Sequence, residues 1–278
     1  MNNFIERSIT GTLSFFKESI FSDELALKKG FLQSIDPRIK AASFALFLIS
    51  ALFIRNIALL LFLYSLCLLS AHFSKIQLGF FLKRTLIFIP LFSLFIALPA
   101  IFSAITPGEP LFIFRLLGMK LIISRPGLFG AILFVVRVVT SVSFVILLSL
   151  VTRHNELLSV LRLFRIPQIF VMTLGMCYRY IYLFLETIEN TCLAIKSRVG
   201  AKICYAKGQR IVAWNIGNLW QRSSQLNEEV YKAMLSRGYT GEPRLLDEFR
   251  ANVRDWVWLF SAIAIATLVV YLDWVWIA

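Results

Sequence analysis

Long apolar runs with few charges alternate along this chain with charged, amphipathic segments. Five apolar runs are expected to form membrane-spanning helices. Only Arg55 and Asn56 separate the first two runs, so these form a tight helical hairpin with no domain between them. The pattern therefore predicts an all-α polytopic membrane protein with about five transmembrane helices. The five runs cover residues 41–54, 57–73, 85–103, 128–151 and 256–276.

Two of these runs contain residues that predict how the helix sits. Pro90 and Pro99 lie inside the third run and are expected to kink it. The last run carries a pair of tryptophans at each end, as helices do where they meet the two membrane interfaces. Residues 256–274 of that run rise about 27 Å, close to the thickness of a hydrocarbon core.

Arg137 is a charged residue inside the fourth run. A charge at that depth faces other helices or a wet crevice rather than lipid. Two interpretations stay open: Arg137 tethers backbone carbonyls of neighbouring helices, or it marks an ion path.

The composition places the chain in the membrane class. Hydrophobic residues make up 58% of the 278 residues and charged residues only 16%, which excludes an ordinary soluble domain. The formal net charge of +13 is typical of cytoplasmic loops facing anionic lipid headgroups, so a lipid membrane is the expected partner and nucleic acid is not. Four cysteines lack metal-ligand spacing and are expected to be free thiols, with neither disulfides nor zinc. They are Cys67, Cys177, Cys192 and Cys204.

The first 40 residues predict an interfacial arm. They carry acidic residues, among them Glu6, Glu18, Asp23 and Glu24, and no uninterrupted apolar core, unlike a cleavable signal peptide. Apolar residues fall three to four apart between charges, as in a helix lying along a membrane surface. These residues are Ile9, Leu13, Phe16, Ile20 and Phe21.

The placement of lysine and arginine decides the topology. Residues 166–185 are apolar and long enough to span, but a sixth crossing would move the 11 basic residues of segment 196–254 outside, against the positive-inside tendency. We therefore expect this segment to lie under the bundle, with the N-terminus cytoplasmic and the C-terminus outside the cell membrane. The expected parts are an arm (1–40), transmembrane helices 1 to 4 (41–152), cytoplasmic coupling helices (153–254) and the last transmembrane helix (255–278).

The second half of the cytoplasmic segment is strongly amphipathic. Its apolar stripe is expected to pack against the partner helix that ends at Arg198. The stripe consists of Ile216, Leu219, Trp220, Ser223, Leu226, Val230, Ala233 and Met234.

A short pattern occurs twice in this segment, each time closing a helical stretch. The two copies are Ser197-Arg198-Val199, followed by Gly200, and Ser236-Arg237-Gly238. One interpretation is that each arginine is a charged fork that fits a carboxylate-lined socket on another protein. The other is that each is a cation before a glycine cap, stabilised by the helix dipole by about 0.3 to 1 kcal/mol.

Several motifs in order resemble the transmembrane T component of energy-coupling factor (ECF) transporters, most of all the CbiQ type of cobalt and nickel importers. The resemblance covers nearly the whole chain. It rests on Asp36-Pro37-Arg38-Ile39-Lys40, on Arg179-Tyr180 followed by 183–186, on Lys196-Ser197-Arg198, and on the run 230–241 from Val230 to Gly241.

The resemblance implies a scaffold that couples two ABC ATPase subunits to a substrate-binding membrane subunit, CbiM-like in this type, with a small accessory membrane subunit as an optional partner. The family's two coupling motifs fall on Ser197, Arg198 and Val199 and on Ser236, Arg237 and Gly238. Serine stands where the family commonly has alanine, a conservative departure in size. Asp36-Pro37-Arg38 resembles a family signature, but a helix N-cap with proline in the first turn explains it equally well, and we expect that structural role.

Missing chemistry supports a non-enzymatic subunit with no cofactor, catalytic or metal site of its own. The chain has no G-x-x-x-x-G-K-[ST] phosphate loop. Glu109 is the only acidic residue between positions 41 and 155, and His72 and His154 lie far apart in sequence, whereas a divalent cation needs clustered ligands. The alternatives are a T component serving a vitamin-binding subunit, a self-contained secondary transporter with repeats or intramembrane ligands, and an intramembrane enzyme with a nucleophile or metal cluster. The residues match the last two poorly.

Overall fold

The computed structural model describes residues 30–86, 89–101, 110–116, 119–161, 166–199, 205–241 and 252–277. The apolar residues of the expected N-terminal arm, 9–21, lie outside this described part. The chain divides into two compact units. One comprises Met1–Ser22 and Asn155–Glu248, and the other comprises Asp23–His154 and Phe249–Ala278.

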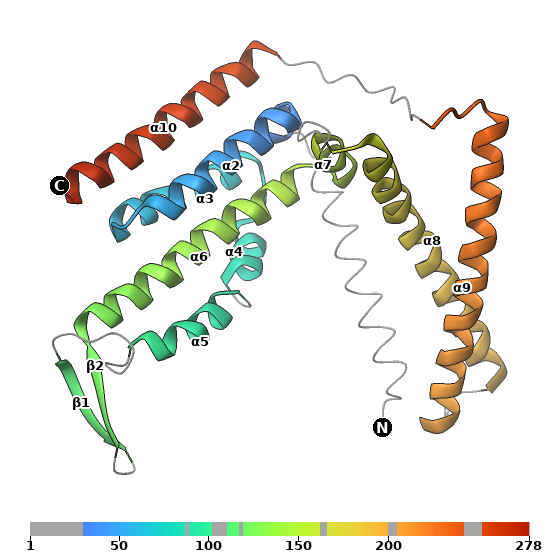
Figure 1. Cartoon of the computed structure of the whole chain (residues 1–278), viewed down its shortest axis with the longest axis horizontal. Coiled ribbons are helices and arrows are strands. Elements are labelled where there is room, and N and C mark those ends of the chain that lie inside the picture. Colours follow the sequence, from blue (N-terminus) through green and yellow to red (C-terminus); the bar gives the residue numbers. More distant parts are fainter. Residues whose placement is uncertain are drawn as a thin grey trace. The chain divides into compact units, whose positions relative to one another are not determined.

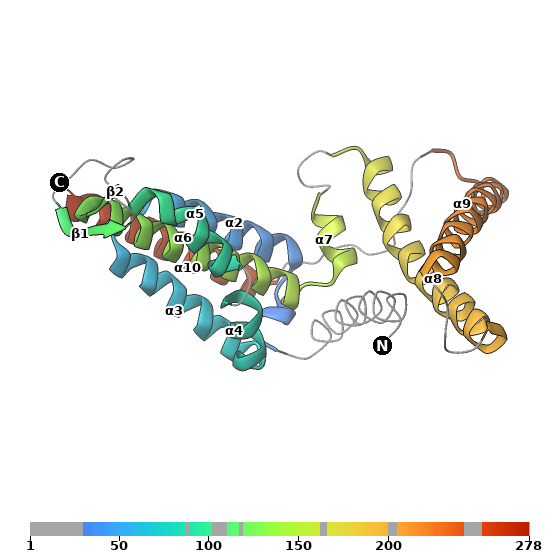
Figure 2. The same ribbon diagram turned by 90° about the horizontal axis from the view of Figure 1, so that it is seen from below.

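The second unit, here called the membrane unit, is a bundle of long apolar helices. The helices α2 (Pro37–Phe53), α3 (Ile57–Phe73), α6 (Arg125–Val151) and α10 (Val253–Ile277) run side by side in Figures 1 and 2. Helix α6 contacts both α2 and α3, and α10 packs on α2. Phe144 of α6 stacks on Phe47 of α2 with ring centroids 5.3 Å apart, and both rings are buried. Aromatic packing thus holds the centre of the bundle.

The outer surface of this unit is apolar. Leu91 and Phe95, for example, are 71% and 72% exposed, which suits contact with lipid rather than water. By length and composition, four described segments can cross a membrane: Leu78–Ala100, Arg125–Val151, Gln168–Ile195 and Val253–Trp276, while Ile57–Phe73 is a shorter apolar helix. The prediction of an all-α polytopic membrane protein is confirmed.

Short polar side chains start the helices. The Asp36 carboxylate accepts a hydrogen bond from the Arg38 backbone N–H at 2.9 Å, and Pro37 stands in the first turn of α2. Asn56 caps α3 and Ser124 caps α6 in the same way, through the N–H groups of Ala58 and Gly127. The expected structural role of Asp36-Pro37-Arg38 is therefore confirmed.

The third apolar run is described in two stretches, because residues 87 and 88 lie outside the described part. Helix α4 (Leu78–Leu86) begins earlier than the run expected over residues 85–103, and α5 (Ile89–Ile101) has Pro90 as its second residue. Pro99 lies within α5.

A β-hairpin lies in the chain between α5 and α6. Strand β1 (Pro110–Leu116) pairs antiparallel with β2 (Met119–Ser124), and Leu116 is opposite Met119. The segments are rich in phenylalanine and isoleucine, residues that favour strands. Pairing also satisfies their backbone groups without a helix.

The segment before α2 is anchored on the bundle. Gln33 belongs to the short helix η1 (Leu32–Ser34). Its side-chain amide donates a hydrogen bond of 3.2 Å to the Ser74 carbonyl, and the Ser74 hydroxyl donates one of 2.5 Å to Gln33 Oε1. Phe31 packs edge-on against Trp258 of α10, with centroids 5.6 Å apart. The entry to α2 is thus fixed on both α3 and α10.

The other unit contains two helices of 32 residues, α8 (Gln168–Val199) and α9 (Tyr205–Ser236), after the short α7 (His154–Val160). The Tyr239 hydroxyl beyond the end of α9 donates to the Met172 sulfur near the start of α8, at 3.5 Å. The segment that follows α9 therefore reaches back to the beginning of α8 (Figure 1). We call this pair the α8–α9 unit.

Candidate functional site

The Arg237 motif forms a regular helix terminus. The N–H groups of Gly238 and Tyr239 donate to the carbonyls of Leu235 and Met234, both at 3.0 Å. Gly238 has φ +81°. This arrangement is a Schellman motif, whose left-handed position favours glycine. Arg237 is the residue just before that position, so its exposed side chain projects from a backbone of defined geometry.

The Arg198 motif lies within the last turn of α8. The Ser197 hydroxyl donates to the Ala194 carbonyl at 2.9 Å, and the Ser236 hydroxyl in the other motif donates to the Ala233 carbonyl at 3.0 Å. Both serines therefore bond backward to their own helices, and both are exposed. Arg198 is exposed as well. Val199 ends α8, and Gly200 lies outside the described residues.

The two arginines lie at opposite ends of the α8–α9 unit. Because Tyr239 contacts Met172, Arg237 lies near the start of α8, whereas Arg198 comes 26 residues after Met172. At 1.5 Å of rise per residue, the separation along α8 is about 40 Å. The structure thus does not bring the motifs into one site but presents two separate charged tips.

Neither tip has an ion-pair partner among the residues that the structure describes. The ion pair on α9 between Lys232 and Glu228, at 3.9 Å, involves neither arginine and is highly exposed. Exposed pairs of this kind contribute little to stability. Both guanidinium groups are therefore accessible to carboxylates of another protein.

The apolar stripe on α9 is only partly covered. Leu219, Leu226, Val230 and Met234 are half-buried. Ile216 and Trp220, however, are 63% and 80% exposed. Ser223 and Ala233 are exposed as well. The expectation that the whole stripe packs against α8 is therefore wrong at these four residues, which α8 leaves uncovered.

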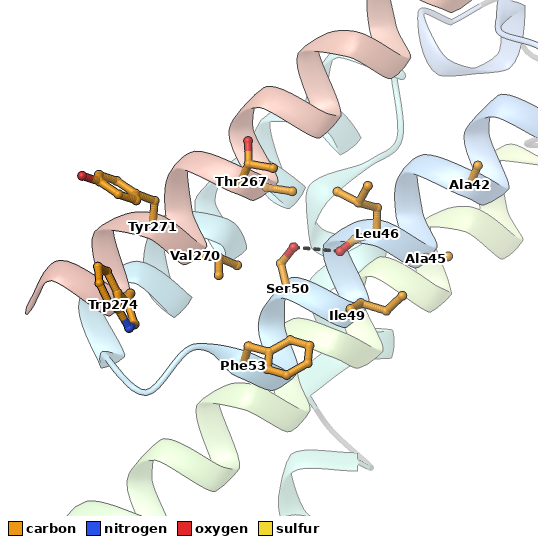
Figure 3. A pocket seen from close by; sticks show the side chains of 11 residues that line it. Ala42, Ala45, Leu46, Ile49, Ser50, Phe53, Thr267, Val270, Tyr271 and Trp274 are labelled. Atoms are coloured by element: carbon orange, nitrogen blue, oxygen red, sulfur yellow. Dashed lines mark hydrogen bonds between the residues drawn. The ribbon is translucent and has the colours of Figure 1, made fainter. Parts of the chain in front are cut away.

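A groove lies between α2 and α10 in the membrane unit. Its volume is about 740 Å³, and Figure 3 shows it open between Phe53 and Leu46 of α2 and Tyr271 and Trp274 of α10. The Ser50 hydroxyl at its wall donates to the Leu46 carbonyl at 2.8 Å. The lining contains no ionisable carboxylate, imidazole or amine, so its chemistry does not suit a divalent cation.

In the described part of the chain, no three His, Cys, Asp or Glu residues gather as a metal site. His72 closes α3 and His154 opens α7. Cys67 is a buried free thiol and Cys177 an exposed one. The side chains of Cys192 and Cys204 lie outside the described set.

Arg137 reaches a backbone carbonyl, as the tether interpretation predicted. Its Nη2 donates to the Ile54 carbonyl in the α2–α3 turn at 2.7 Å. On the other side of the same turn, the Asp273 carboxylate of α10 accepts the N–H groups of Arg55 and Asn56. Sequence reasoning missed Asp273, although an aspartate within a tryptophan-bracketed span was a visible signal.

Comparison with known proteins identifies the family. Residues 28–246 match the profile of CbiQ, described as cobalt transport protein. The chain is 33% identical to the uncharacterized protein MJ1571 of Methanocaldococcus jannaschii over 272 residues, which are 98% of this chain and 93% of that one. It is 27% identical over 122 residues to the nickel permease LarQ of Lactiplantibacillus plantarum, covering 44% of each. This chain therefore belongs to the CbiQ family of cobalt transport proteins and is a multi-pass membrane component of a transport system.

Proposed function

We propose that this chain is the energy-coupling transmembrane scaffold of an ATP-driven ECF-type importer. It relays the motion of two ABC ATPase subunits to a CbiM-like substrate-binding membrane subunit. Cobalt or nickel is the proposed substrate, in keeping with the cobalt transport family and with the similarity to the nickel permease LarQ.

The observation that carries this proposal is the pair of exposed arginine tips at the two ends of the α8–α9 unit. Two similar ATPase subunits need two similar contacts. The chain repeats one motif, and in both copies the serine hydroxyl donates to the carbonyl three residues earlier in its helix. An arginine fork suits a carboxylate-lined socket because it donates two parallel, charge-assisted hydrogen bonds. The separation of about 40 Å lets each tip meet a different subunit.

The two long helices that carry the tips also give a physical route for coupling. When the ATPase subunits approach each other on binding nucleotide, two tips held on long helices must tilt or shift with them. Such an element has two arrangements whose populations depend on nucleotide. The exposed Ile216 and Trp220 on α9 add apolar surface for a further contact.

The proposed orientation puts the N-terminus and the α8–α9 unit in the cytoplasm and the C-terminus outside. Helix α8 has the length and hydropathy to span, yet it carries Arg179, Glu186 and Glu189. Keeping it on the cytoplasmic side leaves most of the basic residues inside. It also places both arginine tips where ATP is available.

The test is the double variant Arg198→Ala/Arg237→Ala, expressed together with the ATPase and substrate-binding subunits of its importer. Removing one partner of a buried charge pair typically costs about 2 to 5 kcal/mol, so each single variant should weaken copurification of the ATPases and the double variant should abolish it. Arg222→Ala, at an exposed position in the middle of α9, is the matched control and should behave as wild type. Normal nucleotide-dependent uptake by the double variant would contradict the proposal and would mean that both arginines only stabilise the ends of their helices.

A further inference from the structure

We propose that Arg137 and Asp273 are one ion pair, divided by a single peptide group of the α2–α3 turn, that locks α6 and α10 onto the α2–α3 hairpin. This inference concerns the membrane unit and does not depend on the proposed coupling function.

The geometry joins the two charges through the peptide between Ile54 and Arg55. Arg137 Nη2 donates to the Ile54 carbonyl oxygen at 2.7 Å. The Arg55 N–H donates to both carboxylate oxygens of Asp273 at 3.1 Å, and the Asn56 N–H donates to one of them at 2.9 Å. The Ile54 carbonyl and the Arg55 N–H are the two ends of one planar amide.

The signs of the charges match the polarity of that amide. A carbonyl oxygen carries the negative end of the peptide dipole, where the guanidinium lies, and the N–H carries the positive end, where the carboxylate lies. From the bond lengths, the donor nitrogen of Arg137 and the nearest Asp273 oxygen are at most about 8 Å apart. The amide therefore transmits their attraction through a polarised chain of hydrogen bonds.

Each charge needs this compensation. Asp273 is only 5% exposed and Ile54 is fully buried. In the described part of the chain, no direct salt bridge joins either residue to an opposite charge, and Arg137 Nε is buried without a hydrogen-bond partner. A charge left alone in such surroundings is strongly destabilising, whereas the divided pair is neutral as a whole.

The expected signature is thermodynamic coupling between residues that do not touch. At a separation of about 8 Å and an effective dielectric constant of about 20, the attraction between two unit charges changes an equilibrium constant by a factor of about 30. Each of Arg137→Met and Asp273→Asn should raise the unfolding equilibrium constant of the full chain in detergent micelles. The double variant should be about thirtyfold more stable than the product of the two single effects predicts.

A second cycle supplies the control. Asp255 is another buried carboxylate on α10, 2% exposed and 18 residues before Asp273. The pair Arg137→Met and Asp255→Asn should therefore be additive, as distant sites are within about a factor of two. Additivity of Arg137→Met with Asp273→Asn would overturn the proposal and leave two independent tethers.

The exchanged variant Arg137→Asp/Asp273→Arg tests the role of the amide. An ordinary salt bridge tolerates exchange of its partners, but here a carboxylate would face the carbonyl and a guanidinium the N–H groups. This variant should be no more stable than the worse single variant, and recovery of wild-type stability would overturn the proposal. If the single variants do not survive extraction into detergent, the amount of each variant in intact membranes is measured instead. The double variant Arg137→Met/Asp273→Asn should then accumulate to a higher level than either single variant. An equal or lower level would also overturn the proposal.

Discussion

Replacing Gly238 by alanine isolates the backbone geometry of the Arg237 tip. Gly238 has φ +81°, and a Cβ built there meets no atom within 4 Å. The substitution therefore brings no steric clash but only the left-handed penalty of a residue with a Cβ, about 1 to 2 kcal/mol. That energy should be lost from the last turn of α9 and not from the membrane unit.

The expected result is local fraying. A penalty of 1 to 2 kcal/mol corresponds to about 5- to 30-fold more opening, so the Tyr239 amide, which donates to Met234, should exchange its hydrogen faster by that factor. Gly238→Asn should lose less, because asparagine tolerates the left-handed region. Hydrogen exchange measured by mass spectrometry on peptides covering residues 234–241 gives this comparison.

Gly217→Ala is the matched control for this experiment. Gly217 lies inside α9, and a Cβ there also meets no atom within 4 Å. Alanine at this position should strengthen the helix by about 0.5 to 1 kcal/mol. In the assembled importer, Gly238→Ala should weaken ATPase copurification while Gly238→Asn and Gly217→Ala retain it. Wild-type exchange in Gly238→Ala, or equal losses in the alanine and asparagine variants, would refute the argument from backbone geometry.

Three further expectations concern the membrane unit and the isolated chain. Gly30→Ala places a Cβ 2.7 Å from the Ser74 carbonyl oxygen and should destabilise the membrane unit by about 1 to 3 kcal/mol, whereas Gly79→Ala, where no atom lies within 4 Å, should not. Thermal unfolding in detergent compares the two variants, and equal midpoints would contradict the predicted steric clash at Gly30. In a chain whose four native cysteines are replaced by serine, a cysteine at Asn218 should react only from the cytoplasm and one at Trp276 only from outside, and labelling at Asn218 from outside would contradict the proposed orientation. The chain purified alone should bind neither ATP nor cobalt or nickel, because it lacks a phosphate loop and clustered ligands; a stoichiometric micromolar site in isothermal titration would contradict this.

Features that depend on near neighbours in the chain were predictable. The apolar runs of α2, α3, α6 and α10 follow from composition, since a helix in lipid must satisfy its own backbone and present apolar side chains. The capping of α2 by Asp36 involves a residue two positions away. The end of α9 likewise follows from glycine directly after Arg237.

Other features depended on residues far apart in the chain. Asp273 binds the N–H groups of residues more than 200 positions earlier, and no local pattern indicates which turn a buried carboxylate will cap. The position of Arg237 beside the start of α8 rests on the contact of Tyr239 with Met172. The exposure of Trp220 was equally hidden, because an amphipathic pattern shows that a face can be buried but not what covers it. Local sequence thus determined the helices and their ends, whereas packing decided which distant residues came into contact, because contacts between distant segments form only when the whole chain has folded.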